Sequence, residues 1–164
     1  MNNESSLPDG TWTIDPNAST VTVTVMKMKV MSVPATLTVM SGTITIAGGK
    51  VGQVEVVADA ASYKSSTTLR DKEVLKANFL DAVKYPTITF TASDGSADRV
   101  EGQVAMKGTT APLTFDISAL NIDGNAATFT AKAKVDRTAV GVTKMPSFIV
   151  GKELDIEVQV KATS

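Results

Sequence analysis

The chain has 164 residues, enough for one domain with a sizeable core. It carries 16 Lys and Arg against 17 Asp and Glu, and this balance argues against a nucleic-acid-binding domain, which normally needs a basic excess. It has no cysteine and no histidine. These absences exclude disulfides, thiolate catalysis, Cys-ligated metal centres and the Ser-His-Asp triad.

The first residues, MNNESSLP, show neither the basic start nor the apolar run of a signal peptide. No stretch of the sequence approaches the ~20 apolar residues of a membrane-spanning helix. We therefore expect a protein that is not integral to a membrane. We expect it to be cytoplasmic as written, or periplasmic or secreted if an export signal was removed.

Apolar and polar residues alternate with a period of two along most of the chain, which is typical of half-buried β-strands. The apolar positions are largely β-branched, and threonines fill many of the positions between them. In chain order the alternation covers residues 21–25, 33–39, 44–46, 88–90, 100–106, 113–117, 129–135 and 154–160.

Turn-forming residues separate these runs, as expected for strands joined by short connections. They lie at 15–17, 41–42, 48–50, 94–96, 107–108, 123–125 and 151–152. About eight strands at this spacing predict an all-β fold, a single antiparallel, lipocalin-like β-barrel. The interior of such a barrel is either filled by its own side chains or holds one small ligand.

One segment departs from the alternation. Leu75 and Phe79 lie four residues apart, and Glu73 lies three residues from both Arg70 and Lys76. This spacing predicts one short α-helix at about residues 69–77, which could close one end of the barrel. We expect a flexible N-terminal segment over residues 1–10 and one barrel domain over residues 11–163.

Several motifs together resemble the YceI-like family. Residues 10–16 (GTWTIDP) resemble its opening motif. The most specific match is LRD at 69–71, FLD at 79–81 and KYPTITF at 84–90, and MKGTTAPL at 106–113 resembles a later family motif. The resemblance continues into the closing strands, at residues 140–142 and 150–154.

The resemblance implies a lipocalin-like barrel whose apolar interior holds an isoprenoid chain, such as a polyprenyl lipid or the tail of a quinone. It also implies that a homodimer is one assembly to test, because dimers are common in the family. This chain departs from the family at Ala18, at Met26 and Lys27, at Ala35 and at Lys72. If relatives use polar groups there to hold a ligand head group, the selection of head groups here must differ.

The alternation and the resemblance together predict a ligand site on the inner face of the barrel. A lipid pocket is mostly apolar, with few polar groups. The residues expected to line its wall are Val23, Val25, Val33, Leu37, Val39, Phe79, Phe90, Phe115 and Phe129. Flexible methionines are expected at its mouth, at Met26, Met28 and Met145.

These residues favour non-catalytic binding, transport or sequestration of an amphipathic isoprenoid lipid of polyprenyl or quinone type. No cofactor is expected apart from such a bound lipid or quinone, and no metal site. The alternative is a self-filled barrel that acts through its outer surface as a protein-interaction or stress-response module. An enzyme is not expected, because no spacing links two carboxylates in one site and no catalytic motif is present.

The charged residues of the family signature admit two interpretations. Arg70, Asp71 and Lys84 could contact a ligand head group at the barrel mouth, or Asp71 could cap the predicted helix in an ion pair. Tyr63 and Tyr85 could offer a hydroxyl group to a quinone oxygen, although tyrosine is also common at a barrel rim.

Overall fold

The computed structural model describes residues 7–27, 31–48, 50–65, 75, 80–96, 98–141 and 150–164. In this part of the chain, nine β-strands and two short 3-10 helices form an all-β fold. The elements are β1 (Gly10–Ile14), η1 (Pro16–Ala18), β2 (Thr20–Lys27), β3 (Met31–Ala47), β4 (Lys50–Lys64), β5 (Thr87–Gly95), β6 (Arg99–Met106), β7 (Thr109–Asp123), β8 (Ala126–Asp136), η2 (Arg137–Val140) and β9 (Val150–Thr163).

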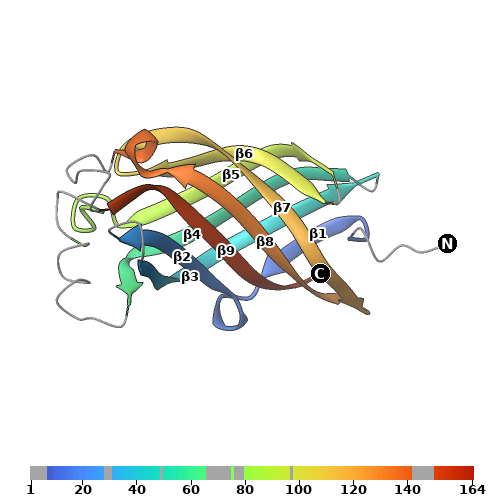
Figure 1. The fold of residues 1–164 in the computed structure, drawn as a ribbon. Helices are drawn as coiled ribbons and strands as arrows, with labels where there is room; N and C mark the ends of the chain where they lie inside the picture. Colours follow the sequence, from blue (N-terminus) through green and yellow to red (C-terminus); the bar gives the residue numbers. More distant parts are fainter. Residues whose placement is uncertain are drawn as a thin grey trace.

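The strands close into an antiparallel barrel, as the sequence predicts (Figure 1). Around the ring the order is β3, β2, β9, β8, β7, β6, β5 and β4, and β4 pairs again with β3. Strands β1 and β2 share one position, because each pairs with both β3 and β9, at different heights. The barrel therefore has eight strand positions filled by nine strands.

A single buried serine bridges the break between β1 and β2. The chain leaves the sheet through η1, where the Asp15 side chain accepts a hydrogen bond of 2.9 Å from the Asn17 N–H. Ser19 then accepts a hydrogen bond of 3.0 Å from the Lys161 N–H and donates one of 3.4 Å to the Lys161 carbonyl. The Asp15 N–H also donates to that carbonyl, at 2.8 Å. These bonds satisfy the Lys161 backbone of β9 on the side where neither β1 nor β2 pairs with it.

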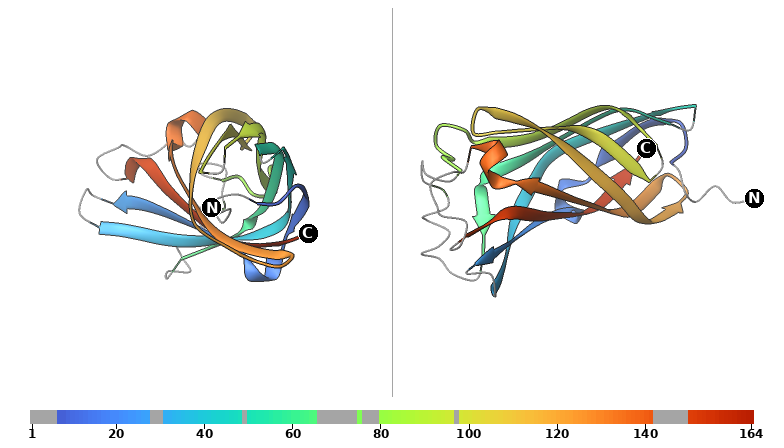
Figure 2. Two further views of the ribbon diagram at one scale, coloured as in Figure 1. Left: turned by 90° about the vertical axis from the view of Figure 1, so that its right-hand side faces the viewer. Right: turned by 45° about the horizontal axis from the view of Figure 1, so that its top comes forward.

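The two ends of the barrel differ (Figures 1 and 2). At one end, here called the mouth end, β2 finishes and β3 begins, residues 80–86 lead into β5, and η2 follows β8. At the opposite base end, tight turns join β3 to β4 and β7 to β8, and β9 finishes beside β1. Trp12, only 1% exposed, lies on β1 at this end, and its indole N–H donates to the Pro8 carbonyl at 2.9 Å.

The core is the inner face of the barrel. In β8 the apolar residues from Ala127 to Val135 are buried at every second position, and the threonines and lysines between them are half-buried or exposed. The alternation in the sequence therefore marks inside and outside as predicted. The buried set draws on every strand and includes Ile14, Val21, Leu37, Ile44, Val54, Phe90, Val104, Leu113, Phe129 and Val160.

Two predicted turns are wrong. Ser41 and Gly42 lie within the continuous strand β3, at an irregularity in its pairing with β4. Gly42 is needed because a Cβ atom there would lie 2.6 Å from Ile14 Cδ1, so the glycine permits close packing of β1 on β3. Gly151 and Lys152 likewise belong to β9.

Parts of the other expectations fall outside the described residues. The predicted helix at 69–77 does so except for Leu75, whose carbonyl accepts a 3.0 Å hydrogen bond from the Ala82 N–H. Residues 1–6 of the expected N-terminal segment also lie outside the described part of the chain. The flexibility of that segment stays a prediction.

Gly102 of β6 offers a test of the inner packing. A Cβ atom at this position would lie 2.3 Å from the Thr91 carbonyl oxygen and 2.7 Å from Phe90 Cζ. Because one of these neighbours is backbone, Gly102→Ala is expected to destabilise the protein by about 1–3 kcal/mol. Urea denaturation of the purified variant measures this change.

Gly52→Ala in β4 is the matched control for Gly102→Ala. A Cβ atom there meets its nearest neighbour, the Thr45 carbonyl oxygen, at 3.4 Å, which is an ordinary contact. This variant is expected to keep the stability of the parent within about 1 kcal/mol. Equal losses for both variants would contradict the close packing of Phe90 on Gly102.

Candidate functional site: the inner face of the barrel

One wall of the interior is densely filled by aromatic and aliphatic side chains. The rings of Phe90 (β5) and Phe115 (β7) meet edge to face, with centroids 4.9 Å apart and an interplanar angle of 88°. Phe90 lies over Gly102, where any side chain would collide with the ring. Leu113, 3% exposed, pairs with Gly102 across the β6–β7 ladder. The interior therefore has little room beside Phe90, Leu113 and Phe115.

The wall formed by β2 and β9 is different. Val23 and Val25 on β2, and Leu154, Ile156 and Val158 on β9, occupy inward positions yet keep accessible surface. They lie within their strands rather than at free ends. In the ring order β2 and β9 stand opposite β6 and β5, so this more open wall faces the filled one.

Small side chains explain why this wall is open. The ladders place Ala35, Val23, Ile156 and Ala133 side by side across β3, β2, β9 and β8. Two alanines in a row of four leave volume that larger residues would occupy. Because side chains on the inner face of a closed ring can gain accessible surface only inside the barrel or at its ends, the surface that Val23 and Ile156 keep faces the interior or the mouth end.

Charged groups of these strands lie on the outer face instead. Lys132 (β8) and Glu157 (β9) approach to 3.7 Å, and Lys134 contacts Glu153 at 3.5 Å and Asp155 at 3.8 Å. All are substantially exposed, so each pair contributes at most about 1 kcal/mol. Among the described residues, no three His, Cys, Asp or Glu side chains are grouped to hold a metal ion. The inner face offers an apolar surface, which suits an apolar molecule.

Seven of the nine predicted wall residues have side chains that the structure describes, and all seven lie on the inner face of the barrel. Leu37, Val39, Phe90, Phe115 and Phe129 are buried on the inner face. Val23 and Val25 lie on the more open wall. Val33 and Met26 lie in β3 and β2, but their side chains are outside the described part. Phe79, Met28 and Met145 fall wholly outside it. Contact of any of these residues with a ligand stays a prediction.

The predicted site residues do not include Leu154, Ile156 and Val158, although these three alternate with polar residues in the sequence. The sequence does not reveal the pairing of β9 with β2, which aligns Ile156 with Val23 and Leu154 with Val25. These strands are separated by more than half of the chain, so no local signal brings them together. The period-two alternation over residues 154–160 indicates that these side chains share one face of the strand, but it does not indicate which strand lies beside them.

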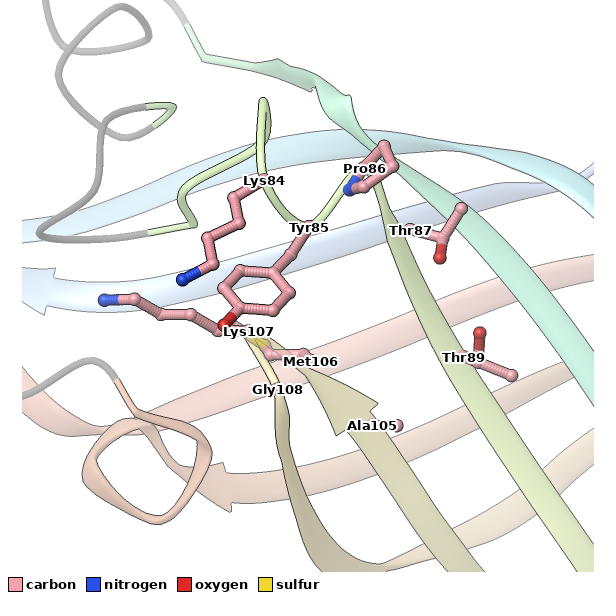
Figure 3. A pocket seen from close by; sticks show the side chains of 9 residues that line it. All are labelled: Lys84, Tyr85, Pro86, Thr87, Thr89, Ala105, Met106, Lys107 and Gly108. Atoms are coloured by element: carbon pink, nitrogen blue, oxygen red, sulfur yellow. The ribbon is translucent and has the colours of Figure 1, made fainter.

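A second hollow of about 210 Å³ lies at the mouth end, outside the inner face (Figure 3). Its lining includes Thr87 and Thr89 of β5 and Ala105 of β6. Each of these is next in sequence to a residue on the inner face, so its own side chain faces outward. The Tyr85 ring packs on the turn at Gly108, where a Cβ atom would lie 3.1 Å from the ring. The Tyr85 hydroxyl therefore lies beside this outer hollow.

Several solved structures share this fold. BcnA of Burkholderia cenocepacia superimposes with a TM-score of 0.79 at 21% identity, covering 92% of this chain and 99% of that one. A structure described as a polyisoprenoid binding domain from Saccharophagus degradans gives a TM-score of 0.74 at 11% identity, covering 93% and 98%. At these identities the likeness establishes the fold alone.

Sequence relatives agree with the fold. Protein YceI of Escherichia coli is 30% identical over 92 residues, which is 51% of this chain and 48% of that protein. A UPF0312 protein of Vibrio vulnificus is 38% identical over 69 residues, covering 38% of this chain and 36% of that protein. The matches thus span about half of these curated relatives or less. In the described residues no helix combines the length and apolar character needed to cross a bilayer.

The decisive comparison is with the model of the YceI-like domain, which matches residues 12–162. That match runs from the buried Trp12 of β1 to the buried Ala162 of β9, and so includes nearly the whole barrel. The chain belongs to the YceI-like family.

Proposed function

We propose that this barrel binds an amphipathic isoprenoid lipid, of polyprenyl or quinone type, along the inner face of β2 and β9, and carries or sequesters it without catalysis. The observation that carries the proposal is the accessible apolar surface of Val23, Ile156 and Val158 inside a closed ring. The description of the Saccharophagus degradans structure as a polyisoprenoid binding domain supports the ligand class.

The chemistry of the open wall suits a branched hydrocarbon chain. Burial of apolar surface contributes roughly 25 cal/mol per Å², so a long tail can bind tightly with no charged contact. An isoprenoid tail presents methyl branches along its length, which pack against the branched side chains of Val23, Leu154 and Ile156. A polar head group would stay at the mouth end, where water and the charged loops are available.

The alternative function is that of a self-filled barrel that acts through its outer surface in protein interactions or a stress response. The packing of Phe90 on Gly102 and against Phe115 favours this alternative, because it fills one wall without a ligand. The two functions differ in one measurable respect: only the lipid carrier has an interior that a second molecule can enter.

Native mass spectrometry of the purified protein, followed by organic extraction, tests the proposal. We expect a stoichiometric isoprenoid or its uptake when a quinone or polyprenyl lipid is added. A spectrum of empty protein that takes up neither lipid would overturn the proposal and favour the self-filled barrel.

Truncation of inner residues distinguishes an open wall from a filled one. In lipid-free protein, Leu113→Ala should cost about 2–5 kcal/mol, since it leaves a cavity in dense packing. Ile156→Ala on the open wall should cost about 1 kcal/mol, because part of its surface is already accessible. Chemical denaturation of both variants provides the comparison. Equal, large losses would show that the β2–β9 wall is as tightly packed as the other.

Enlargement of a side chain on the open wall should exclude the ligand. Val23→Phe places a ring in the space beside Ile156, so a folded variant is expected to lose most of its bound lipid. Thr20→Phe is the matched control, because Thr20 is exposed on the outer face of the same strand. Extracted lipid per protein, measured with circular dichroism as the check on folding, reports the result. Undiminished lipid in a folded Val23→Phe protein would remove this wall from the site.

A further inference from the structure

We propose that the mouth end of the barrel docks on an anionic lipid bilayer through Val83, Lys84 and Lys107, so that the interior opens toward the membrane. This inference rests on the proposed function, because it supplies the route by which a membrane lipid reaches the barrel. Three independent observations carry it: an exposed apolar side chain, a pair of lysines beside a hollow, and the distribution of charge between the two ends.

Val83 is the first observation. It is 97% exposed, whereas its neighbours Leu80 and Ala82 are buried. Backbone hydrogen bonds hold the turn, because the Asp81 carbonyl accepts from the Lys84 N–H at 3.1 Å and from the Tyr85 N–H at 2.8 Å. The turn therefore presents an apolar side chain to solvent from a fixed position at the mouth end. Insertion into the acyl region of a bilayer would bury that side chain.

The lysines beside Val83 are the second observation. Lys84 Nζ lies 5.4 Å from the centre of the Tyr85 ring, and Lys107 Nζ donates to the Gly141 carbonyl at 3.2 Å. Both side chains extend to the same side of Tyr85 (Figure 3). Thr87 and Thr89 add hydroxyl groups to the adjoining hollow of about 210 Å³. Ammonium and hydroxyl donors at the rim of a hollow suit the phosphate of a lipid head group.

The charge of the two ends is the third observation. At the base end the exposed charged residues at or beside the turns are Asp9, Asp98, Glu101 and Asp123, with Lys50 and Arg99. At the mouth end, Lys64 joins Lys84 and Lys107.

Acidic groups also lie at the mouth end, namely Asp81 in the turn that carries Val83, Asp136 and Glu153. Asp136 accepts hydrogen bonds from Thr138, and Glu153 pairs with Lys134. Among the charges of the described residues the base end is thus the more acidic, so an anionic surface would repel it more than the mouth end.

A bilayer fits these features better than an acidic protein. An acidic protein would contact the lysines, but it would leave the exposed Val83 side chain in water. A bilayer uses both, because the head groups meet the lysines while the valine enters the acyl boundary. Each lysine near an anionic membrane contributes about 1 kcal/mol, so this surface gives weak, reversible docking.

Co-sedimentation of the intact protein with vesicles tests the proposal. The wild type is expected to bind phosphatidylcholine vesicles that contain about 30 mol% phosphatidylglycerol, and to bind pure phosphatidylcholine much less. Lys84→Glu should lower the partition coefficient about tenfold or more, since it reverses a charge. Val83→Ser should lower it about threefold or more, because it removes apolar contact.

Two matched variants serve as controls. Lys50→Glu makes the same charge change at the base end, and Met40→Ser removes an apolar side chain that is 51% exposed on β3. Both should bind vesicles as the wild type does. Docking is overturned if the wild type ignores anionic vesicles, or if Lys50→Glu weakens binding as much as Lys84→Glu. Binding to polyglutamate but not to vesicles would assign the surface to an acidic protein and also overturn docking.

A separate readout keeps this proposal distinct from lipid binding. The amount of lipid extracted from each variant is measured in vesicle-free buffer, where Lys84→Glu and Val83→Ser should match the wild type. Normal lipid content together with vesicle binding that neither variant alters would overturn docking alone. Vesicle binding that depends on Lys84 and Val83, in a wild type that takes up no lipid, would support docking and overturn the proposed function.

Discussion

Ring closure is the constraint on which the rest of the structure depends. An open sheet would expose two edges, whereas here β3 pairs with both β2 and β4 and no long edge is left between them. Closure requires one ring position to be shared by two short strands, and Ser19 makes the junction continuous by bonding both backbone groups of Lys161. Loss of the Ser19 side chain, which is only 6% exposed, would leave these Lys161 backbone groups without that partner at the point where β1 and β2 meet.

Closure also decides what the alternation in the sequence means. Once the ring is shut, every second side chain points inward, and the interior is filled or open according to the sizes of those side chains. On the wall of β5 to β7, the Phe90 ring packs directly against Gly102, in the space that a larger side chain at position 102 would need. Alanines in the ranks of β3 and β8 leave the β2–β9 wall open beside Val23 and Ile156. The same closed backbone therefore carries one wall of tightly packed side chains and one wall whose side chains keep more accessible surface.

Much of this fold could be predicted from the sequence, because the alternation is a local property of each strand. The alternation over Thr20 to Val25 and over Phe129 to Val135 indicates which side chains face inward, without any tertiary information. The role of Gly42 could not be predicted, since its cause is the approach of Ile14 from a strand far away in the chain. The partnership of β9 with β2 was hidden for the same reason, so the sequence identified Val23 but not the adjacent Ile156 as part of the candidate site.

The apolar wall by itself can select its ligand only weakly. A hydrophobic pocket distinguishes molecules that differ by one methylene group by about 1–3 kcal/mol, and it accepts many chains of similar width. Polar recognition must then come from where the ligand's head group meets the protein. The hollow beside Tyr85 lies on the outer face, so its donors, Lys84, Lys107 and the threonine hydroxyl groups, would meet the bilayer in the proposed docking rather than a ligand inside the barrel. In the proposed carrier, the β2–β9 wall would supply most of the affinity, and selection among head groups would come from polar groups other than these.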